Sequence, residues 1–195
     1  NLGVVAEMCD RVGVMYAGTM AEIGPTRAVF KEPLHPYTKG LMESIPRVTE
    51  EKERLQIIPG TVPNLITPPL GCRFHPRCPV ALAHCGWTAK EVRSRLEPLV
   101  EERGRESIAD AVLGWDDKDP AKLIVRCERP QDVADWCSST IALHKEDAVL
   151  QTVESVAVED SRVVLRLIRQ VKPPMLEPSP GHFVSCYQYG GWPPA

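Results

Sequence analysis

The sequence has no long apolar run, few aromatic residues and no marked excess of charge of either sign. Aromatic residues make up 6% of the 195 residues, and the formal net charge is -3. The best apolar run, residues 163–168 (VVLRLI), contains an arginine. It is much shorter than the roughly 20 residues that a membrane-spanning helix needs. A weakly negative chain has no general attraction to nucleic acid or anionic lipid. We therefore expect no membrane span and no nucleic-acid partner.

Two further absences concern chemistry and the beginning of the chain. Phosphoryl transfer needs a glycine-rich phosphate loop with its lysine and an acidic residue that holds Mg²⁺. Neither a G-x-x-x-x-G-K-[ST] run nor a strand ending in Asp-Glu is found, so we predict no catalytic and no ATP-binding residue here. No basic segment followed by an apolar one indicates secretion. Asn1 is not an initiator methionine, and we expect the chain to be a fragment of a longer protein.

Proline and cysteine, in contrast, are abundant. The 19 prolines are nearly twice the usual share of about 5%, which predicts many turns and loops. Seven cysteines in a chain without a secretion signal more often bind metal or catalyse than form disulfides. No cysteine, histidine and acid form a recognisable local signature of a nucleophilic enzyme. Metal binding is therefore the chemistry that the cysteines favour.

The first part of the chain reads as small elements separated by turns. Below about 40 residues a segment rarely buries a core alone, so this part must dock on a missing segment or on the rest of the chain. Thr26 and His35 are the expected helix caps, with Pro36 at a first helical position. The expected elements are a helix end at 1–9, strands at 10–16 and 19–23 around an Ala17-Gly18 turn, and helices at 26–31 and 37–44.

The rest of the chain is expected to change character twice. Residues 47–54 are charged and read as a connector, and the proline-punctuated residues 56–69 read as an extended strap. The pattern of residues 86–172 predicts a small α+β insert without an internal repeat. A proline-rich stretch follows the insert and precedes a closing segment at 181–189. The insert is expected to contain helices at 88–103 and 132–150 and strands at 122–127, 151–158 and 162–171.

Several motifs follow one another in the order found in one family. Residues 2–7 (LGVVAE), 9–12 (CDRV) and 15–18 (MYAG) resemble the last part of an ABC ATPase domain. The remaining motifs resemble the C-terminal extension of oligopeptide and dipeptide importer ATPases. These are residues 22–25 (EIGP), 30–38 (FKEPLHPYT), 59–63 (PGTVP), 72–79 (CRFHPRCP) and 181–186 (GHFVSC).

The resemblance implies a fold, a function and partners. The fold would be α+β: residues 1–46 as the C-terminal edge of an ABC ATPase domain, 47–85 and 173–195 as a loop-rich, cysteine-containing extension, and 86–172 as the insert. The family's switch histidine would immediately precede Asn1, which stands where the family usually has aspartate. The parent protein would bind ATP and Mg²⁺, pair with a second ATPase subunit and drive peptide import through permease subunits. It would lie at the cytoplasmic face of the cell membrane, as a peripheral subunit.

Four cysteines are candidate metal ligands. Cys72, Cys78 and Cys85 lie in one loop-rich segment, and Cys186 resembles the closing cysteine of the family. Structural zinc usually has pairs of cysteines separated by about two to four residues, and the spacings here are wider. The resemblance implies a [4Fe-4S] cluster; a zinc site and metal-free packed or disulfide-linked cysteines stay open as alternatives. Cys127 is a rival for the fourth ligand, and Arg73 and Arg77 are expected to offset the cluster's negative charge.

Two functions of different classes follow. The first is a piece of the ATP-hydrolysing subunit of a peptide importer, inactive alone. In it, the segment His35-Pro36-Tyr37 begins a helix and holds the extension against the ATPase core. The alternative is a free-standing iron–sulfur or zinc-binding interaction module. As an isolated piece of an ATPase, the chain would expose apolar side chains near its beginning, namely Val4, Val12, Val14 and Met15.

Overall fold

The computed structural model describes residues 2–44, 58–103, 108, 111–190 and 192, and it divides the chain into two compact units. The first unit is Asn1–Ala81 together with Lys172–Ala195, and the second is Leu82–Val171. The second unit thus begins slightly before the insert predicted at 86–172. The predicted connector at 47–54 and the boundary after residue 46 lie outside the described residues. The functional roles assigned to these domains stay predictions.

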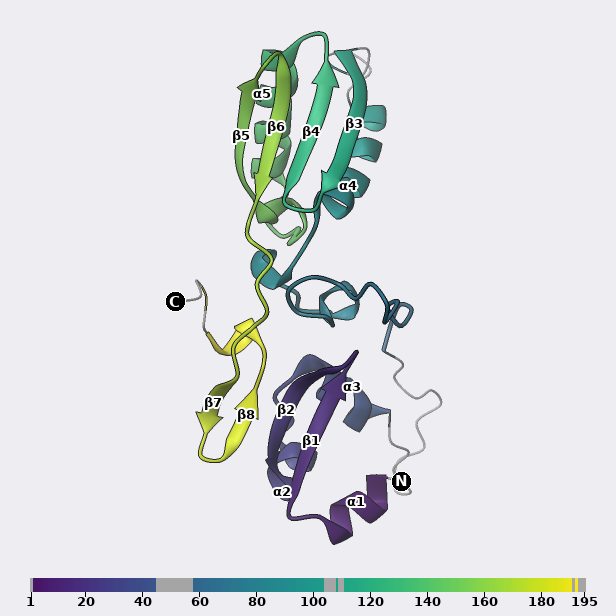
Figure 1. The fold of residues 1–195 in the computed structure, drawn as a ribbon, viewed down its shortest axis with the longest axis vertical. Coiled ribbons are helices and arrows are strands. Elements are labelled where there is room, and N and C mark those ends of the chain that lie inside the picture. The colour runs from purple at the N-terminus through teal and green to yellow at the C-terminus, as the bar shows by residue number, and fades with distance from the viewer. Residues whose placement is uncertain (1, 45–57, 104–107, 109–110, 191, 193–195) are drawn as a thin grey trace. The chain divides into compact units, whose positions relative to one another are not determined.

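The first unit is built on a four-stranded antiparallel sheet of order β1-β2-β8-β7 (Figure 1). Its β8 pairs with β2 through Glu22 opposite Val184 and Ile23 opposite Phe183. The small N-terminal elements therefore complete their sheet with the last part of the chain. Its elements are α1 (Leu2–Met8), β1 (Arg11–Tyr16), β2 (Thr19–Pro25), α2 (Thr26–Lys31), α3 (Pro36–Glu43), β7 (Leu176–Ser179) and β8 (His182–Val184).

The turn between β1 and β2 has the predicted place. Ala17 and Gly18 both have positive φ, 47° and 79°, as a two-residue hairpin turn requires when its twist matches that of the strands. The predicted cap at Thr26 is wrong, because Pro25 is the residue before α2 and makes no side-chain capping bond. The Thr26 hydroxyl instead donates to the carbonyl of Cys9. It thereby ties the start of α2 to the residue after α1.

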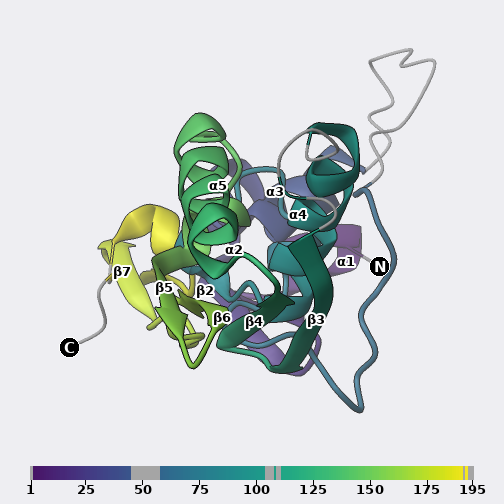
Figure 2. The same cartoon turned by 90° about the horizontal axis from the view of Figure 1, so that it is seen from above.

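The second unit is a four-stranded antiparallel sheet of order β3-β4-β6-β5 with both helices on one face (Figures 1 and 2). In chain order it is a helix and a hairpin, followed by a second helix and a second hairpin. No repeat was predicted, and the structure shows one, which pairs the two hairpins through β4 and β6. Its elements are α4 (Ala89–Arg103), β3 (Val112–Asp119), β4 (Lys122–Cys127), α5 (Pro130–Leu143), β5 (Val153–Glu159) and β6 (Arg162–Leu167).

The core of the second unit lies between the sheet and the two helices. Leu123, Val125 and Leu165 have no exposed surface and face Val92 and Leu96 of α4 in one apolar cluster. The prediction of mixed helix and sheet is confirmed. Several details were wrong. Strand β3 was not predicted, and the helix expected at 132–150 ends at Leu143, after which a 3-10 turn, Leu150–Thr152, precedes β5. The strand expected at 162–171 ends at Leu167.

The loops between α3 and α4 contain little regular structure. Residues 58–69 have neither helix nor strand, as their prolines predict; residues 56–57 of the predicted strap lie outside the described part. A 3-10 turn, His75–Arg77, follows in the first unit, and a second, Ala83–Cys85, opens the second unit. A third, Tyr187–Tyr189, follows β8. The candidate cysteines therefore lie in or beside short turns. No helix within the described ranges meets the length and apolarity of a membrane span.

Candidate functional site

A buried carboxylate lies at the centre of the first unit. Glu22 on β2 has no exposed surface, and both of its oxygens accept hydrogen bonds. The backbone N–H groups of Leu34 and His35 donate to Oε1 and Oε2 at 2.9 and 2.8 Å. Burying a charge is costly unless hydrogen bonds compensate it. These bonds do so, and they fix the segment before α3 against β2.

The same carboxylate reaches the last part of the chain. Nε2 of His182 on β8 lies 2.7 Å from Oε1 of Glu22, and both side chains are buried. Gly24 allows this approach, because a Cβ there would stand 2.6 Å from the His182 ring. His182 thus connects β8 to β2, and Glu22 holds three segments together.

His35 caps α3 as predicted. Its Nδ1 accepts from the backbone N–H of Tyr37 at 3.0 Å, and Pro36 takes the first helical position. An accepting Nδ1 is unprotonated, so the ring is neutral in this arrangement. Burial lowers the pKa of His35 to about 4, against a raising effect of Glu22 and a further lowering by Lys39. The segment His35-Pro36-Tyr37 is thus a structural helix start.

An aromatic cluster joins this helix start to the cysteine-bearing loop. The ring of Phe74 packs edge-on against Tyr16 at 5.1 Å, and tilted against Tyr37 at 5.4 Å and His35 at 5.7 Å. Tyr16 and Tyr37 meet at 4.7 Å. Such pairs contribute about 0.5–1.5 kcal/mol beyond area burial. Aromatic packing therefore helps to hold the loop on the β1–β2 hairpin and α3, before any metal is considered.

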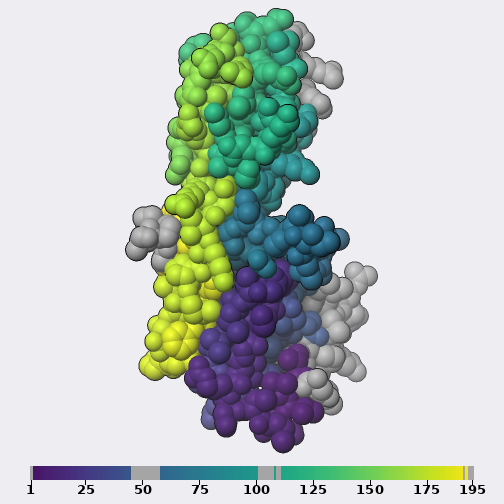
Figure 3. All heavy atoms as spheres, viewed as in Figure 1, coloured from purple at the N-terminus to yellow at the C-terminus, as the bar shows by residue number. Residues whose placement is uncertain are grey.

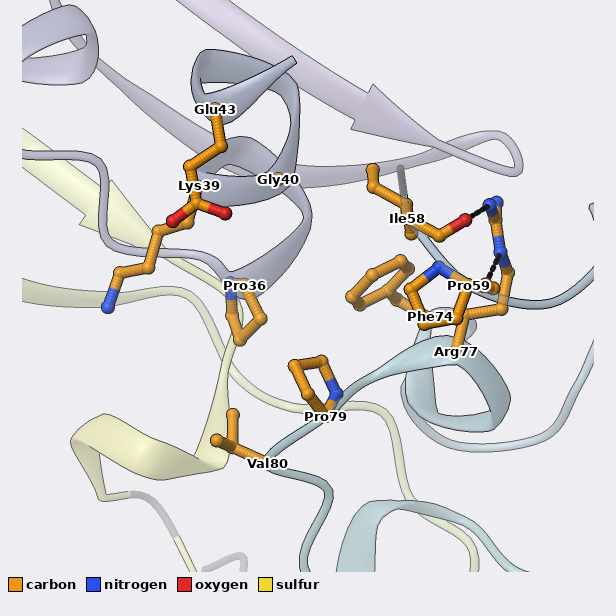
Figure 4. Close-up of a pocket in the computed structure, with 10 residues that line it drawn as sticks. All are labelled: Pro36, Lys39, Gly40, Glu43, Ile58, Pro59, Phe74, Arg77, Pro79 and Val80. Carbon is orange, nitrogen blue, oxygen red and sulfur yellow. Dashed lines mark hydrogen bonds between the residues drawn. The ribbon is translucent and has the colours of Figure 1, made fainter. Parts of the chain in front are cut away.

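A cavity of about 360 Å³ opens between α3 and the loop. Figure 4 shows the rings of Pro36, Phe74 and Pro79 lining it, with Glu43 of α3 also on its wall. Its walls are largely apolar, which suits a small apolar group. Lys39, Glu43 and Arg77 are the charged residues of its lining.

The cysteine-bearing loop folds back on itself around a 3-10 turn. The N–H of His75 donates to the carbonyl of Cys72 at 3.0 Å, and the N–H of Cys78 donates to that of His75 at 3.1 Å. Nδ1 of His75 also lies 2.7 Å from the Cys72 carbonyl oxygen. These bonds bring Cys72 and Cys78 to the two ends of one tight turn.

The two arginines of this loop have structural partners. Arg73 donates to the carbonyl of Ala17 in the β1–β2 turn. Arg77 donates to the carbonyls of Pro59 and Ile58 at 2.8 and 3.0 Å (Figure 4) and to the Tyr16 hydroxyl at 3.3 Å. We expected both to offset the charge of a cluster. Their donors are used to fix the loop, so no cluster is needed to explain them.

Three of the four predicted ligands lie near one another in the first unit. Burial raises the pKa of the Cys78 thiol to about 12, and Cys72 and Cys186 each raise it further by their charge. Burial also raises the pKa of Cys186, which Lys39 lowers. All three cysteines are free.

The fourth predicted ligand belongs to the second unit. Cys85 is buried, and its Sγ accepts from the N–H of Leu82 at 3.3 Å. The rival Cys127 is a buried residue of β4. Burial raises the pKa of Cys137 in α5, and the charge of the Cys127 thiolate raises it further. Within the described residues, no group of three or more histidine, cysteine or acidic side chains has an arrangement that could hold a metal ion.

The structure thus reveals a site that the sequence did not indicate. Glu22 stands in an ordinary strand pattern, and its partner His182 lies 160 positions away. The role of this arrangement is structural: it joins β2 to the segment before α3 and to β8.

One match to a known protein family covers both the helix start at His35 and the cysteine-bearing loop. Residues 21–85 match the family described as oligopeptide/dipeptide transporter, C-terminal region. The match begins at the buried Ala21–Glu22 pair and ends at Cys85.

Curated proteins match a larger part of the chain. The dipeptide transport ATP-binding protein of Bacillus subtilis is 44% identical over 124 residues, 61% of this chain and 36% of that protein. The oligopeptide transport ATP-binding protein of Salmonella typhimurium is 51% identical over 85 residues, 44% of this chain and 25% of that protein. The dipeptide transport ATP-binding protein of Caldanaerobacter subterraneus is 47% identical over 85 residues and 26% of its length. The matched part thus spans about a quarter to a third of these relatives.

Proposed function

We propose that this chain is the C-terminal part of the ATP-hydrolysing subunit of an oligopeptide or dipeptide ABC importer. The observation that carries the proposal is the match of residues 21–85 to the C-terminal region of such transporters. The identities of 44% and 51% to ATP-binding proteins of dipeptide and oligopeptide transport support it. The parent protein would bind ATP and Mg²⁺ outside this chain, which has no phosphate loop.

The first unit gives this role a physical basis. Strands β1 and β2 would be the edge of the nucleotide-binding domain, and the loop with β7 and β8 would be the extension. Glu22 joins the two through Leu34, His35 and His182. An extension fixed by a buried carboxylate moves with the domain edge, which suits a part that stabilises a dimer or regulates hydrolysis.

The partners of the parent protein follow from the same proposal. They are a second ATPase subunit and membrane permease subunits, with peptide as the indirect substrate. The parent would lie peripherally at the cytoplasmic face of the membrane. Of the four apolar side chains expected to be exposed near the start of the chain, Val12 and Val14 are half-buried, whereas Val4 and Met15 are 55% and 57% exposed. Their exposure supports a preceding domain that packs on α1 and β1.

The test is a graft. This chain replaces the matching C-terminal part of the Bacillus subtilis dipeptide transport ATP-binding protein, and ATP hydrolysis is compared with that of the relative truncated at the same point. We expect the graft to restore hydrolysis and dipeptide uptake. A graft carrying Glu22→Gln should lose part of this effect, and Glu32→Gln at an exposed position after α2 should not. A truncated protein that works as well as the graft would refute an obligatory role for this part.

A metal centre is a second proposal for the cysteines. We propose that thiolates of Cys72, Cys78, Cys85 and Cys186 hold a [4Fe-4S] cluster, which would act as a structural tie. The charges of Cys72 and Cys186 act on Cys78, so three of the four thiols lie close to one another, and this proximity supports the proposal. The fit is incomplete, because the described residues contain no arrangement of three ligands. Four thiolates on an iron–sulfur cube are a common ligand set, and one zinc ion is the competing occupant.

Metal analysis of the chain purified without oxygen tests this second proposal. Iron and acid-labile sulfide near four each per chain, lost in Cys72→Ser and Cys186→Ser but kept in Cys137→Ser, would support the cluster. Zinc in place of iron would replace the cluster with a zinc site. Neither metal, with unchanged folding of the variants, would leave packed cysteines. The transport proposal does not depend on this result.

A further inference from the structure

The cavity between α3 and the cysteine-bearing loop, residues 72–80, has an apolar lining made of rigid parts. In Figure 3 the blue atoms of this loop pack against the purple end of the β1–β2 hairpin. Phe74 is only 2% exposed, and the rings of Tyr16 and Tyr37 hold it in place. Proline rings, which restrict the backbone, form much of the remaining wall (Figure 4). The apolar lining residues are Pro36, Ile58, Pro59, Phe74, Pro79 and Val80.

The wall opposite α3 is fixed by two contacts. Arg77 donates through Nε to the carbonyl of Pro59 at 2.8 Å and through Nη2 to that of Ile58 at 3.0 Å. Ile58 in turn lies against α3 at Gly40, where a Cβ would stand 2.7 Å from its Cγ1. Glycine inside a helix costs roughly 0.5–1 kcal/mol relative to alanine, and here it makes room for Ile58. The cavity of about 360 Å³ is thus preformed, and ligand pockets span about 300–1,000 Å³.

The rim of the cavity carries one cation and one anion. Lys39 and Glu43 lie one turn apart on α3, and both are exposed. Figure 4 shows them on the α3 side, across the cavity from Arg77. Within the described part of the chain, neither side chain forms a hydrogen bond or an ion pair, whereas Arg77 uses its donors on carbonyls. The charges of Lys39 and Glu43 are therefore available to a ligand whose apolar part enters the cavity.

Opposite charges one turn apart favour a zwitterion over a ligand with a single charge. An apolar carboxylate would be attracted by Lys39 and repelled by Glu43, and an apolar amine would meet the reverse. Cβ atoms of residues four apart on a helix are separated by about 5–6 Å. The two ends of an extended dipeptide are about 7 Å apart, which the flexible stem of Lys39 can match. The apolar lining further requires apolar side chains on the peptide.

We propose that this cavity binds a short apolar peptide with free termini. Its amino group pairs with Glu43, its carboxylate pairs with Lys39, and its side chains pack against Phe74 and the prolines of the lining. Burial of the side chains supplies most of the affinity, and the charge-assisted hydrogen bonds at the rim set the orientation. The inference rests on the cavity and its rim, and it does not depend on the transport proposal.

The test uses the full chain and L-leucyl-L-leucine, with binding measured by isothermal titration calorimetry at neutral pH. Three derivatives are compared with it: the N-acetylated peptide, the C-terminal amide and the peptide with both caps. An ion pair at an exposed rim is worth up to about 1 kcal/mol, or about fivefold in affinity. We therefore expect each singly capped peptide to bind about fivefold more weakly than the free peptide, and glycylglycine to bind more weakly still.

Two variants assign each terminus to its partner. Lys39→Gln should weaken binding of the free peptide about fivefold and leave binding of the C-terminal amide unchanged, because the amide has no carboxylate to lose. Glu43→Gln should weaken binding of the free peptide likewise and leave that of the N-acetylated peptide unchanged. The matched control is Lys31→Gln/Glu32→Gln, which removes the same two charges at exposed positions outside the cavity and should bind as the parent chain does.

Hydrogen exchange of the full chain locates the bound peptide. The free peptide should slow exchange in α3 and in residues 72–80 and leave β4 and β6 unchanged. Equal thermal midpoints of the variants and the parent chain show that lost binding is not lost folding. No binding of the free peptide at millimolar concentration overturns the proposal, and so does equal binding by both variants. Equal affinity for the doubly capped peptide also overturns it, and would assign the cavity to an internal segment of a partner protein.

Discussion

The two units of this chain hold together in different ways. The second unit has a continuous apolar core in which residues such as Leu123, Val125 and Leu165 are completely buried. The first unit has a small core, and its segments are joined by buried polar groups, chiefly Glu22 and His182. An apolar core tolerates changes of detail as long as volume is kept. A buried carboxylate requires every one of its donors. The first unit should therefore respond to charge and pH, and the second to volume.

The largest effect is expected from a cavity in the second unit. Leu123→Ala should reduce the free energy of unfolding of this unit by about 3 kcal/mol, because a large buried side chain is removed from a filled core. Segment-resolved hydrogen exchange of the full chain measures it. Leu143→Ala is the matched control, since that leucine is 72% exposed and should change stability by under about 0.5 kcal/mol. Equal loss of protection in β1 and β2 would show that the units do not differ in this way.

A change that conserves shape should act most strongly in the first unit. Glu22→Gln replaces one carboxylate oxygen by an amide NH2 group. This NH2 group would face a hydrogen-bond donor of Leu34, His35 or His182, and that donor would lose its acceptor. The cost should be about 2–3 kcal/mol. Exchange in β2 and β8 should accelerate while that in β4 and β6 stays unchanged. The control Glu43→Gln, at an exposed position, should leave both units as they are. Unaltered protection of β8 in Glu22→Gln would show that Glu22 is not needed to hold β8 against β2.

Acidification should reach the first unit through His35. Its pKa is about 4 in the folded state and about 6.5 when unfolded. Between these values the unfolded chain binds the extra proton, so stability is full above pH 6.5 and falls as the pH drops toward 4. The expected loss between pH 7 and pH 5 is about 2 kcal/mol. His35→Asn keeps a capping acceptor and removes the titration. A variant with the same slope as the parent chain would assign the pH dependence to another group.

The smallest effect concerns the loop. Arg77→Lys keeps the charge but loses the planar fork that donates to the carbonyls of Ile58 and Pro59. We expect a loss of about 1 kcal/mol in the first unit. Exchange at residues 72–78 should report it, with Arg169→Lys as the control. No change in this segment would mean that the aromatic contacts of Phe74 fix the loop by themselves.

Local signals in the sequence sufficed where a segment forms its own structure. The β1–β2 hairpin followed from a short apolar run before the Ala17-Gly18 turn, and the start of α3 followed from His35 and Pro36. Strand β3 was missed because the charges of Asp116, Asp117 and Lys118 hide its pattern. Strand β7 contains Pro178, and β8 has only three residues and follows Gly181 in the turn, so the pairing of β8 with β2 and of β7 with β8 makes them strands.

The candidate site was predicted less completely than the fold. The cysteines and the helix start stand in recognisable motifs. The bond between Glu22 and His182 has no local signal, because each residue satisfies the other only in the folded state. The repeat in the second unit was also missed, since its two hairpins share a pattern of charge and apolarity, as in 122–127 (KLIVRC) and 162–167 (RVVLRL), rather than identical residues.

Because β2 pairs with β8, the sheet of the first unit cannot be completed until the last part of the chain has been synthesised. Glu22 emerges from the ribosome 160 residues before His182, and chains grow at about 5–20 residues per second. For about 10–30 s the edge of β2 that later pairs with β8 stays unpaired, while the whole second unit is translated and can fold. A nascent chain in this state offers an unpaired strand edge to other chains. Slow translation of residues 82–171 would lengthen this exposure, and the yield of correctly closed protein would then depend on elongation rate.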